Sequence, residues 1–406
     1  MLGKIAWKNV WRSKERSLIL IAAIGSGLFG GLLAMSVMFG LSRGTIKNAI
    51  ETVYSHVQIH AKGYAEEPDV NGTIPHSLKL LEDLKKTTGF TVCGRLKVSG
   101  MASSAQNSSG VWVYGIDPSE EKQVTTVSTF IRKGDYFEDS TKLPVVVGEK
   151  LAKKLGVKLK SKIVLTFQNS EGSITSGAFR ITGIFKTNSS MFDESQVFVK
   201  RDSLAVLLGV SEFHEIALRF QDEAGIEAKV EKLRSQYHEL DPVLDIAAWY
   251  DLAPQLDYMS RNMRIIFSIF MGIILLALGF GMVNTMLMVV LERGHELGVL
   301  MAIGMKKTYI FWMLVFETVF LSLSGAALGM ALAAVGIRYY QNHGINLALF
   351  SEGLSRFGIS EKVFPVLPLS LYPGLAFLIV LTAILASIYP ALKVLKQNPA
   401  EALASV

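Results

Sequence analysis

The sequence predicts a membrane protein with four transmembrane α-helices and one large extracytoplasmic α+β domain of two lobes between the first and second helices. Half of the 406 residues are hydrophobic and the mean hydropathy is positive, which is high for a soluble protein of this length. The apolar residues are concentrated in long runs near both ends of the chain. These runs flank a middle section with the mixed pattern of an ordinary soluble α/β sequence.

The first apolar run covers residues 18–41. As a helix rising about 1.5 Å per residue it is roughly 36 Å long, which is enough to cross a bilayer core of about 30 Å. The alternative is a cleaved secretory signal, whose apolar core has only roughly 7–15 residues and is followed by a small-residue cleavage site. The run is longer and no convincing cleavage pattern follows it, so we expect a retained anchor.

Three further runs, at residues 265–291, 309–336 and 371–395, are each long enough to span a membrane. Lys and Arg are enriched in cytoplasmic segments of membrane proteins. With four crossings the basic segments fall on one side, before the first run, between the second and third, and after the fourth: Lys4, Lys8, Arg12, Lys14, Arg16, Arg293, Lys306, Lys307, Lys393 and Lys396. We therefore expect a multi-pass protein of the cell inner membrane with both termini in the cytoplasm. This orientation explains the net charge of +6, so no nucleic-acid partner is expected.

The predicted organisation follows from these four runs. In order, the segments are a cytoplasmic N-terminal segment (1–17), the first span (18–41), the extracytoplasmic domain (42–262) with a β-rich insertion (about 126–209), the second span (265–291), a cytoplasmic segment (292–307), the third span (309–336), an extracytoplasmic loop (337–370), the fourth span (371–395) and a cytoplasmic tail (396–406).

The extracytoplasmic domain alternates strand-like and helix-like stretches. Both of its ends contribute to one lobe, with helices at 78–86 and 223–237 and strands at 56–63, 91–99, 111–116, 214–220 and 243–248. The insertion is predicted to form the second lobe, with strands at 144–148, 162–167, 178–185 and 196–199 and a short helix at 149–155 that Gly156 ends.

No residue pattern predicts catalysis, a bound cofactor or a metal site in this chain. His56, His60 and His76 do not have the spacing of a compact metal motif. Asp193 and Glu194 could act as an acid–base pair, but a turn acceptor is the commoner role for such residues. The lone Cys93 cannot form an internal disulfide, and we expect it to be a small buried residue. The sequence has no phosphate-binding Gly-rich loop, so any ATP must bind to another chain.

Two spans contain glycine pairs that permit close helix packing, Gly27 with Gly31 and Gly325 with Gly329. The alternative is that glycine is simply frequent in membrane helices. Glu317 lies about nine positions into the third span. Because a charge costs on the order of 2.5–3.5 kcal/mol at a helix centre on insertion scales, we expect Glu317 to face protein or water, with a structural hydrogen bond favoured over proton coupling.

Several segments resemble the FtsX-like permease family of ABC transporters, the four-span group that includes MacB-type exporters and Lol-type lipoprotein-releasing permeases. They are AWKNVWRSKERS (6–17), VVVGEKLAKKLGVKLKSKIVL (145–165), FRITGIFKT (179–187), AWYDLAPQLDYMSRN (248–262), NTMLMVVLERGHELGVLMAIGM (284–305) and YPALKVLKQNPAEAL (389–403). The fifth is the most specific, because it is similar to the family signature ER-x-x-E-[IL]-G-x-L-x-A-x-G.

The resemblance implies that this chain is a non-catalytic subunit that works with a separate ABC ATPase in two copies and with a second permease, the same chain or a sibling. ATP and Mg would be bound by the ATPase, and its closure would be transmitted to the extracytoplasmic domain. Within the family we favour release of lipoproteins from the inner membrane, with a periplasmic carrier as a further partner. The alternatives are MacB-like efflux of peptides or small molecules and regulation of a periplasmic partner. A membrane sensor without an ATPase is a third class.

The resemblance also implies that the segment after the second span is the coupling element that lies on the ATPase. Leu297, Leu300 and Met301 share one face of a helix and suit an apolar groove on a partner, with charged residues at its rim and glycines for close approach. The predicted set is Glu292, Arg293, Glu296, Leu297, Gly298, Leu300, Met301 and Gly304. The alternative is a solvated hairpin between two spans.

Acyl chains of a lipoprotein would need an apolar opening to the membrane, and the first and second spans flank the large domain. Adaptable apolar side chains lie near the outer ends of both: Met35, Met38, Phe39, Phe267, Phe270 and Met271. For each of these residues, ordinary packing or lipid contact is the alternative.

Overall fold

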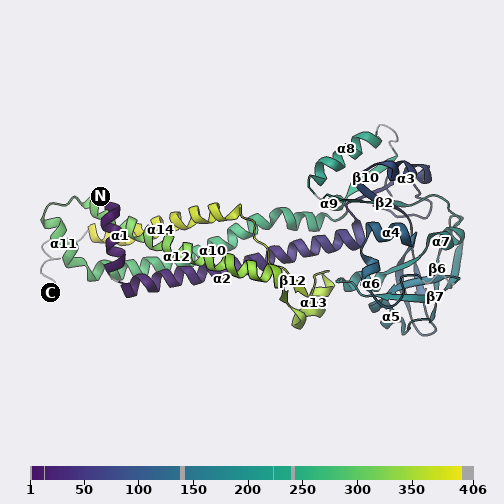
Figure 1. Cartoon of the computed structure of the whole chain (residues 1–406), viewed down its shortest axis with the longest axis horizontal. Helices are drawn as coiled ribbons and strands as arrows, with labels where there is room; N and C mark the ends of the chain where they lie inside the picture. The colour runs from purple at the N-terminus through teal and green to yellow at the C-terminus, as the bar shows by residue number, and fades with distance from the viewer. Residues whose placement is uncertain (1, 13, 138–141, 223, 239–242, 396–406) are drawn as a thin grey trace. The chain divides into compact units, whose positions relative to one another are not determined.

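The computed structural model describes residues 2–12, 14–137, 142–222, 224–238 and 243–395. The chain forms two compact units, each built from separate stretches of sequence. The helical unit contains residues 1–41, 261–345 and 363–406, and the outer unit contains residues 42–260 and 346–362 (Figure 1). The predicted cytoplasmic tail lies outside the described residues.

The helical unit contains the helices that can cross a membrane by length and composition, of which the described residues have four. They are α2 (Lys14–Ala49), α10 (Pro254–Glu292), α12 (Lys307–His343) and α14 (Leu371–Leu395). Two shorter helices accompany them, α1 (Leu2–Arg12) and α11 (Gly294–Ala302).

Every predicted span lies inside one of these helices, and three of the helices continue well beyond the apolar run. Helix α2 continues to Ala49 and then into the π-helical turn η1 (Ile50–Tyr54), while α10 begins at Pro254. Hydropathy identifies the apolar part of a helix, but a helix can continue in water with polar residues. The first and last residues of the predicted extracytoplasmic domain are therefore helical.

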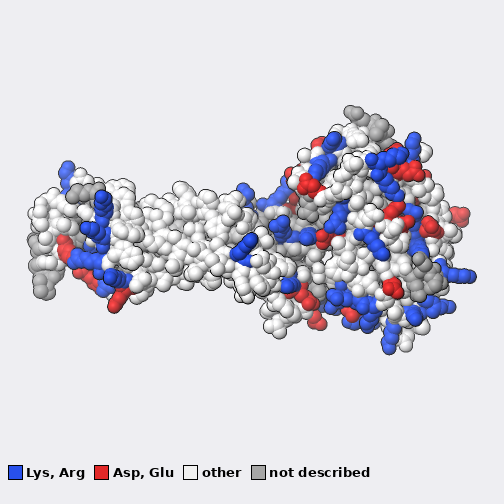
Figure 2. Space-filling model, viewed as in Figure 1, with Lys and Arg blue, Asp and Glu red and all other residues white. Residues whose placement is uncertain are grey.

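Charge is distributed unevenly over the helical unit. Lys, Arg, Asp and Glu gather at the end that holds α1 and α11, and the long middle stretch of this unit shows an uncharged face (Figure 2). Its buried core is apolar and includes Leu28, Leu32 and Ile379. An uncharged band of this kind is what the hydrocarbon region of a bilayer requires.

The outer unit contains a ten-stranded mixed sheet in the order β10-β1-β9-β2-β3-β8-β5-β7-β4, and β6 pairs with β2 and β7. The strands are β1 (Val57–Ala61), β2 (Phe90–Ser103), β3 (Ser108–Ile116), β4 (Ile131–Gly134), β5 (Pro144–Gly148), β6 (Lys162–Gln168), β7 (Ile174–Phe185), β8 (Gln196–Lys200), β9 (Glu215–Phe220) and β10 (Leu244–Ala248).

Helices and turns complete the outer unit. They are α3 (Ser77–Lys86), α4 (Pro118–Val124), η2 (Val127–Phe130), α5 (Glu149–Leu155), α6 (Ser190–Ser195), α7 (Arg201–Leu208), α8 (Ile226–His238), α9 (Trp249–Leu252), η3 (Ala348–Phe350) and α13 (Ser351–Arg356). The short strands β11 (Ile345–Asn346) and β12 (Lys362–Val363) pair with each other.

The predicted mixed α+β architecture is confirmed. The two ends of the extracytoplasmic domain come together, because β1 lies between β10 and β9 and β9 pairs with β2. The insertion supplies β4 to β8. Strand β2 is 14 residues long and pairs with β9 through its first half and with β3 and β6 through its second half. The two portions of the sheet therefore share one strand.

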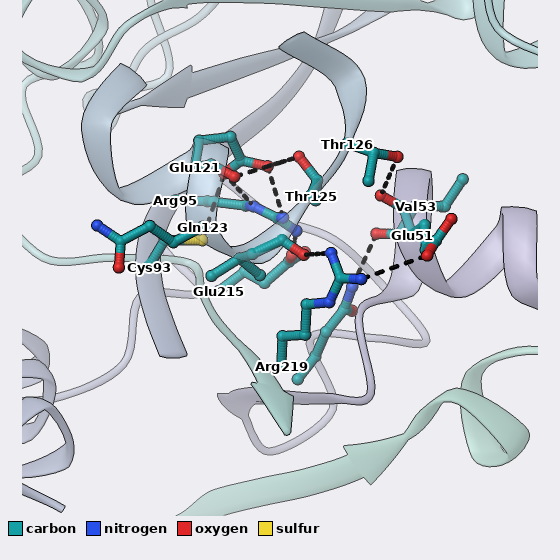
Figure 3. Close-up of polar contacts among 12 residues, drawn as sticks. Glu51, Val53, Cys93, Arg95, Glu121, Gln123, Thr125, Thr126, Glu215 and Arg219 are labelled. Atoms are coloured by element: carbon teal, nitrogen blue, oxygen red, sulfur yellow. Dashed lines mark hydrogen bonds and ion pairs between the residues drawn. The ribbon is translucent and has the colours of Figure 1, made fainter. Parts of the chain in front are cut away.

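A buried ion network joins three elements of the outer unit (Figure 3). Arg95 on β2 donates from Nη2 to Oε1 of Glu121 on α4 at 2.7 Å and from Nη1 to Oε1 of Glu215 on β9 at 2.5 Å. All three side chains are almost completely buried. Thr125 Oγ1 donates to the same Glu121 oxygen, and Cys93 Sγ donates to the other at 3.3 Å. Such pairing offsets the cost of removing three charges from water.

Candidate functional site

The segment between the second and third spans forms a hairpin with a short helix at its tip. Arg293 leaves the helical conformation, with φ −93° and ψ 11°, and separates α10 from α11. After α11 the chain turns at Gly304, whose φ of +95° is a left-handed conformation that residues with a side chain rarely adopt. Helix α12 begins at Lys307. The segment is therefore held in a definite shape by its own backbone.

The apolar face of α11 is turned toward the chain itself. Leu297 is 1% exposed, and Leu300 and Met301 are partly buried against the same cluster. That cluster is formed by the ends of α10, α12 and α14 and includes Met286, Val290, Ile310, Leu314 and Ala391. The expectation that these three residues fill a groove on a partner is therefore wrong for Leu297. Burying them within the chain removes the same apolar area from water without a partner.

The exposed surface of the segment lies at the end of α11. Ala302 and Gly304 are exposed there, and Ile303 is 79% exposed, while His295 is exposed at the start of the helix. We did not single out Ile303 from the sequence because the helical spacing drew attention to the opposite face. Ile303 is thus a large apolar side chain that this end of the segment leaves uncovered.

Arginine side chains hold the segment from two directions. Arg12 in α1 and Arg16 in α2 form ion pairs with Glu296 and Glu292. Arg293 Nε also lies 3.2 Å from Glu296 Oε2. Partial burial raises the pKa of Glu296, but the hydrogen bond and charge of Arg293, with those of Arg12, outweigh it and lower this pKa overall. The carboxylate of Glu296 is thus kept ionised, and it binds both Arg12 and Arg293.

The basic N-terminal segment is itself a helix, α1, packed on α12. Ala6 and Val10 are buried in this contact, and the Trp7 ring lies edge-on to Phe320 with the ring centroids 5.6 Å apart. Trp7 and Trp11 remain nearly half exposed, as is usual for tryptophan at a membrane–water interface.

Glu317 faces protein, and its partner is Arg293 at the junction of α10 and α11. The side chain is 4% exposed, and Arg293 Nη1 lies 3.2 Å from its Oε1 and 3.3 Å from its Oε2. Arg293 therefore joins the end of α10, the start of α11 and the interior of α12 through charge-assisted hydrogen bonds. The sequence did not reveal this partner, because the two residues are 24 positions apart.

The glycines of the spans pack helices within the chain. A Cβ on Gly329 would lie 2.5 Å from the carbonyl oxygen of Gly25, and one on Gly325 would lie 2.9 Å from Cβ of Ile24, so α12 lies close against α2. Gly27 and Gly31 instead face Leu278 and Ile274 of α10. The predicted glycine pairs are thus covered by helices of the same chain, and the contribution of Gly25 was missed.

The six predicted lining residues do not form one surface. Met35, Phe267 and Met271 are buried in the core of the helical unit, and Phe39 is partly buried with its ring centroid 6.2 Å from that of Phe267. Met38 is 42% exposed and Phe270 is 39% exposed. Apolar side chains gain little by leaving lipid, so van der Waals packing between the helices accounts for the buried ones.

The polar candidates of the outer unit have structural roles. The buried carboxylate of Asp193 accepts hydrogen bonds from the Thr187 backbone N–H at 3.0 Å and from its hydroxyl at 2.7 Å. Burial raises the Asp193 pKa to about 6, although the Thr187 hydrogen bonds oppose this. Glu194 lies 2.5 Å from Lys154 Nζ. His56 Nδ1 accepts the Phe220 backbone N–H at 2.9 Å.

No metal-binding cluster is formed by the described residues. His60 Nε2 lies 3.0 Å from Gln58 Oε1, and His76 caps α3 with a left-handed backbone. Across the described ranges no three His, Cys, Asp or Glu side chains come together as metal ligands would.

Comparison with known proteins agrees with this organisation. The family model of the MacB-like periplasmic core domain matches residues 17–236, and that of the FtsX-like permease C-terminal region matches residues 268–399. Among the most similar relatives is a lipoprotein-releasing system transmembrane protein, LolC of Neisseria meningitidis serogroup B, which is 24% identical over 97% of this chain and 96% of that protein.

Two further relatives align with very different shares of this chain. The lipoprotein-releasing system transmembrane protein LolE of Haemophilus influenzae is 21% identical over 99% of this chain and 98% of that protein. A macrolide export ATP-binding/permease protein, MacB 2 of Yersinia pestis bv. Antiqua, is 28% identical over 48% of this chain and 27% of that protein.

Proposed function

The chain belongs to the family of ABC transporter permeases that combine a MacB-like periplasmic core domain with an FtsX-like C-terminal region, and from this premise we propose that it converts closure of a separate ATPase into motion of its outer unit. It is an inner membrane protein with an extracellular domain. We propose that both termini and α11 lie in the cytoplasm. The clustering of basic residues around α1 and α11 supports this orientation (Figure 2).

The observation that carries this proposal is the construction of the tip of α11. Ile303 is exposed at the end of α11, while Leu297 is fixed in the apolar cluster and Glu296 is fixed by two arginines. A force applied to the tip would reach α10 and α12 directly, because Arg293 and Leu297 connect α11 to both helices. We propose that Ile303 inserts into an apolar groove of the ATPase and that the charged residues form the rim.

ATP and Mg would be bound by the ATPase in this arrangement. We propose a complex of two ATPase subunits and two permeases, the second permease being either another copy of this chain or a sibling.

For the cargo we propose lipoproteins of the inner membrane, delivered to a periplasmic carrier. The support is that relatives from lipoprotein-releasing systems align with nearly the whole chain, whereas the macrolide exporter aligns with about half of it. Efflux of peptides or small molecules is the second candidate, because the core domain matched by this chain is described as MacB-like and about half of the chain aligns with a macrolide export protein. Regulation of a periplasmic partner is a third.

Cargo is best identified by cross-linking in the complete complex. A photoreactive residue replaces Met38, which is 42% exposed near the outer end of the first apolar run, and a matched probe replaces Phe377, which is 68% exposed on α14. Lipoprotein cross-linked at position 38 but not at position 377 is the expected result. Cross-links to soluble peptides alone would reject lipoprotein release and favour efflux. Equal labelling at positions 38 and 377 would show that the first span does not line the path of the cargo.

A further inference from the structure

The outer unit contains a cavity of about 360 Å³ that no part of the proposed coupling mechanism uses. Four stretches line it: the last turn of α2 with η1, the residues around α6, the start of α10, and the turn after α13. All of them belong to the outer unit. The volume lies within the range of roughly 300–1,000 Å³ that is typical of ligand sites.

The lining has neutral hydrogen-bonding groups beside apolar ones. Asn48, Thr52 and Gln255 contribute amides and a hydroxyl, and Val53 and Leu256 contribute aliphatic surface. No described lining residue is an Asp or Glu, and Arg356 is the one lining residue of the described set with a full charge. A ligand for this cavity must therefore be uncharged or weakly anionic and must carry both apolar and hydrogen-bonding groups.

One lining group lacks the partner that its burial requires. Oε1 of Gln196 is buried without a hydrogen-bond partner in the described part of the chain, although its Nε2 donates to Ser195 Oγ at 3.2 Å. Leaving such an acceptor unsatisfied is costly, so buried acceptors normally have a donor nearby. The acceptor selects a ligand with an N–H or O–H group, which an acyl chain does not have.

The rim and the floor of the cavity also have unusual features. Met191 and Phe357 line the cavity and remain 70% and 75% exposed. The turn η1 is a π-helix, a rare element that is frequent at functional sites, and it is followed by Ser55 with a left-handed φ of 56°. The exposed side chains offer apolar contact at the mouth of the cavity.

We propose that this cavity binds a short, extended, uncharged stretch of the protein cargo, with a backbone N–H on Gln196 Oε1 and an apolar side chain between Met191 and Phe357. This inference rests on the proposed function, since it assigns the polypeptide part of the cargo to a site in the outer unit. Asn48 belongs to the helix that contains the first span, and Gln255 to the helix that contains the second. A change in the separation of these two helix ends would change the shape of the cavity and release the segment.

The test measures binding of three probes to the full-length chain in nanodiscs: a fluorescent uncharged octapeptide with a central leucine, the same peptide with an N-terminal palmitoyl group, and fluorescent palmitate. Both peptides are expected to bind. Loss of one hydrogen bond in Gln196→Leu should weaken their binding about tenfold, and Met191→Glu at the exposed rim should weaken it as well. Gln123→Leu, which alters an exposed amide outside the cavity, should change nothing.

Palmitate binding that equals peptide binding and is insensitive to Gln196→Leu would overturn the proposal in favour of a lipid. Absence of peptide binding, while lipoprotein still cross-links at position 38, would refute the cavity site and leave the proposed function standing. Peptide binding with no lipoprotein in the complex would support the cavity site and reject lipoprotein release.

Discussion

The ion pair between Arg293 and Glu317 is the contact through which we expect the coupling segment to act on the third span. Glu317 is 4% exposed and Arg293 is 18% exposed, and Arg293 also pairs with Glu296. Replacing Arg293 by Met keeps most of the side-chain volume and leaves the buried carboxylate without a countercharge. Removing one partner of a buried pair costs about 3–5 kcal/mol.

The opposite substitution should cost less. In Glu317→Gln the arginine keeps Glu296 as a partner and the amide oxygen can still accept a hydrogen bond, so we expect a loss of about 1–3 kcal/mol. Replacing both residues, Arg293→Met with Glu317→Leu, removes the charges together, and such replacement is often close to neutral. The double variant should therefore be more stable than Arg293→Met alone.

The assay is the free energy of unfolding of the chain in mixed micelles, measured for the three variants and the unchanged protein. ATP hydrolysis by the complex is measured in parallel. We expect the double variant to recover stability but not ATPase stimulation, because the connection between α11 and α12 is then lost. If the double variant is no more stable than Arg293→Met alone, removing the buried carboxylate brings no recovery, Arg293 and Glu317 do not interact, and the reasoning is refuted.

Two further predictions concern packing and pH. Gly329→Leu should destabilise the helical unit by about 1–3 kcal/mol through overpacking, because its Cβ would meet backbone atoms of Gly25, whereas Gly30→Leu should be harmless because nothing lies within 4 Å; equal thermal unfolding temperatures in micelles would contradict this. Burial raises the pKa of Glu215, but the charges of Arg95 and Lys97 outweigh it and lower this pKa overall. The stabilisation is therefore present above the unfolded-state pKa and is lost as the pH falls through the folded one, so acid should unfold the protein and Glu215→Gln should flatten that dependence.

Local sequence patterns predicted most elements of the outer unit, because the spacing of apolar residues and the turn-forming glycines depend on neighbouring residues alone. Strand β5 and helix α5 have the predicted bounds, and Gly156 ends α5 in a left-handed conformation as expected. The spans were found because an apolar run long enough to cross a bilayer, with few charges, is typical of a transmembrane helix. The sequence did not predict how far the helices extend beyond the apolar runs, to Ala49 in α2 and from Pro254 in α10. Such an extension into water depends on tertiary contacts.

The segment between the second and third spans was located from its sequence, but the orientation of its helix was not. Periodicity identified Leu297, Leu300 and Met301 as one face and could not tell whether a partner or the chain itself covers that face. The contacts of Glu317 and Gly25 were hidden for a related reason, because each involves a residue on a different helix. Long-range pairing of this kind is not contained in a local pattern.

The central claim is that the exposed tip of α11 binds the ATPase, and retention of the ATPase subunit during purification of the chain from membranes tests it most directly. Ile303→Glu places a charge where we propose an apolar anchor, and loss of an anchor typically costs about 2 kcal/mol or more of binding free energy. Val206→Glu, at a residue that is 83% exposed on α7 of the outer unit, is the matched control. The account predicts that Ile303→Glu folds and inserts but retains at most about a tenth of the ATPase, while Val206→Glu retains all of it. Full retention by Ile303→Glu, with unchanged ATP hydrolysis, would contradict the account.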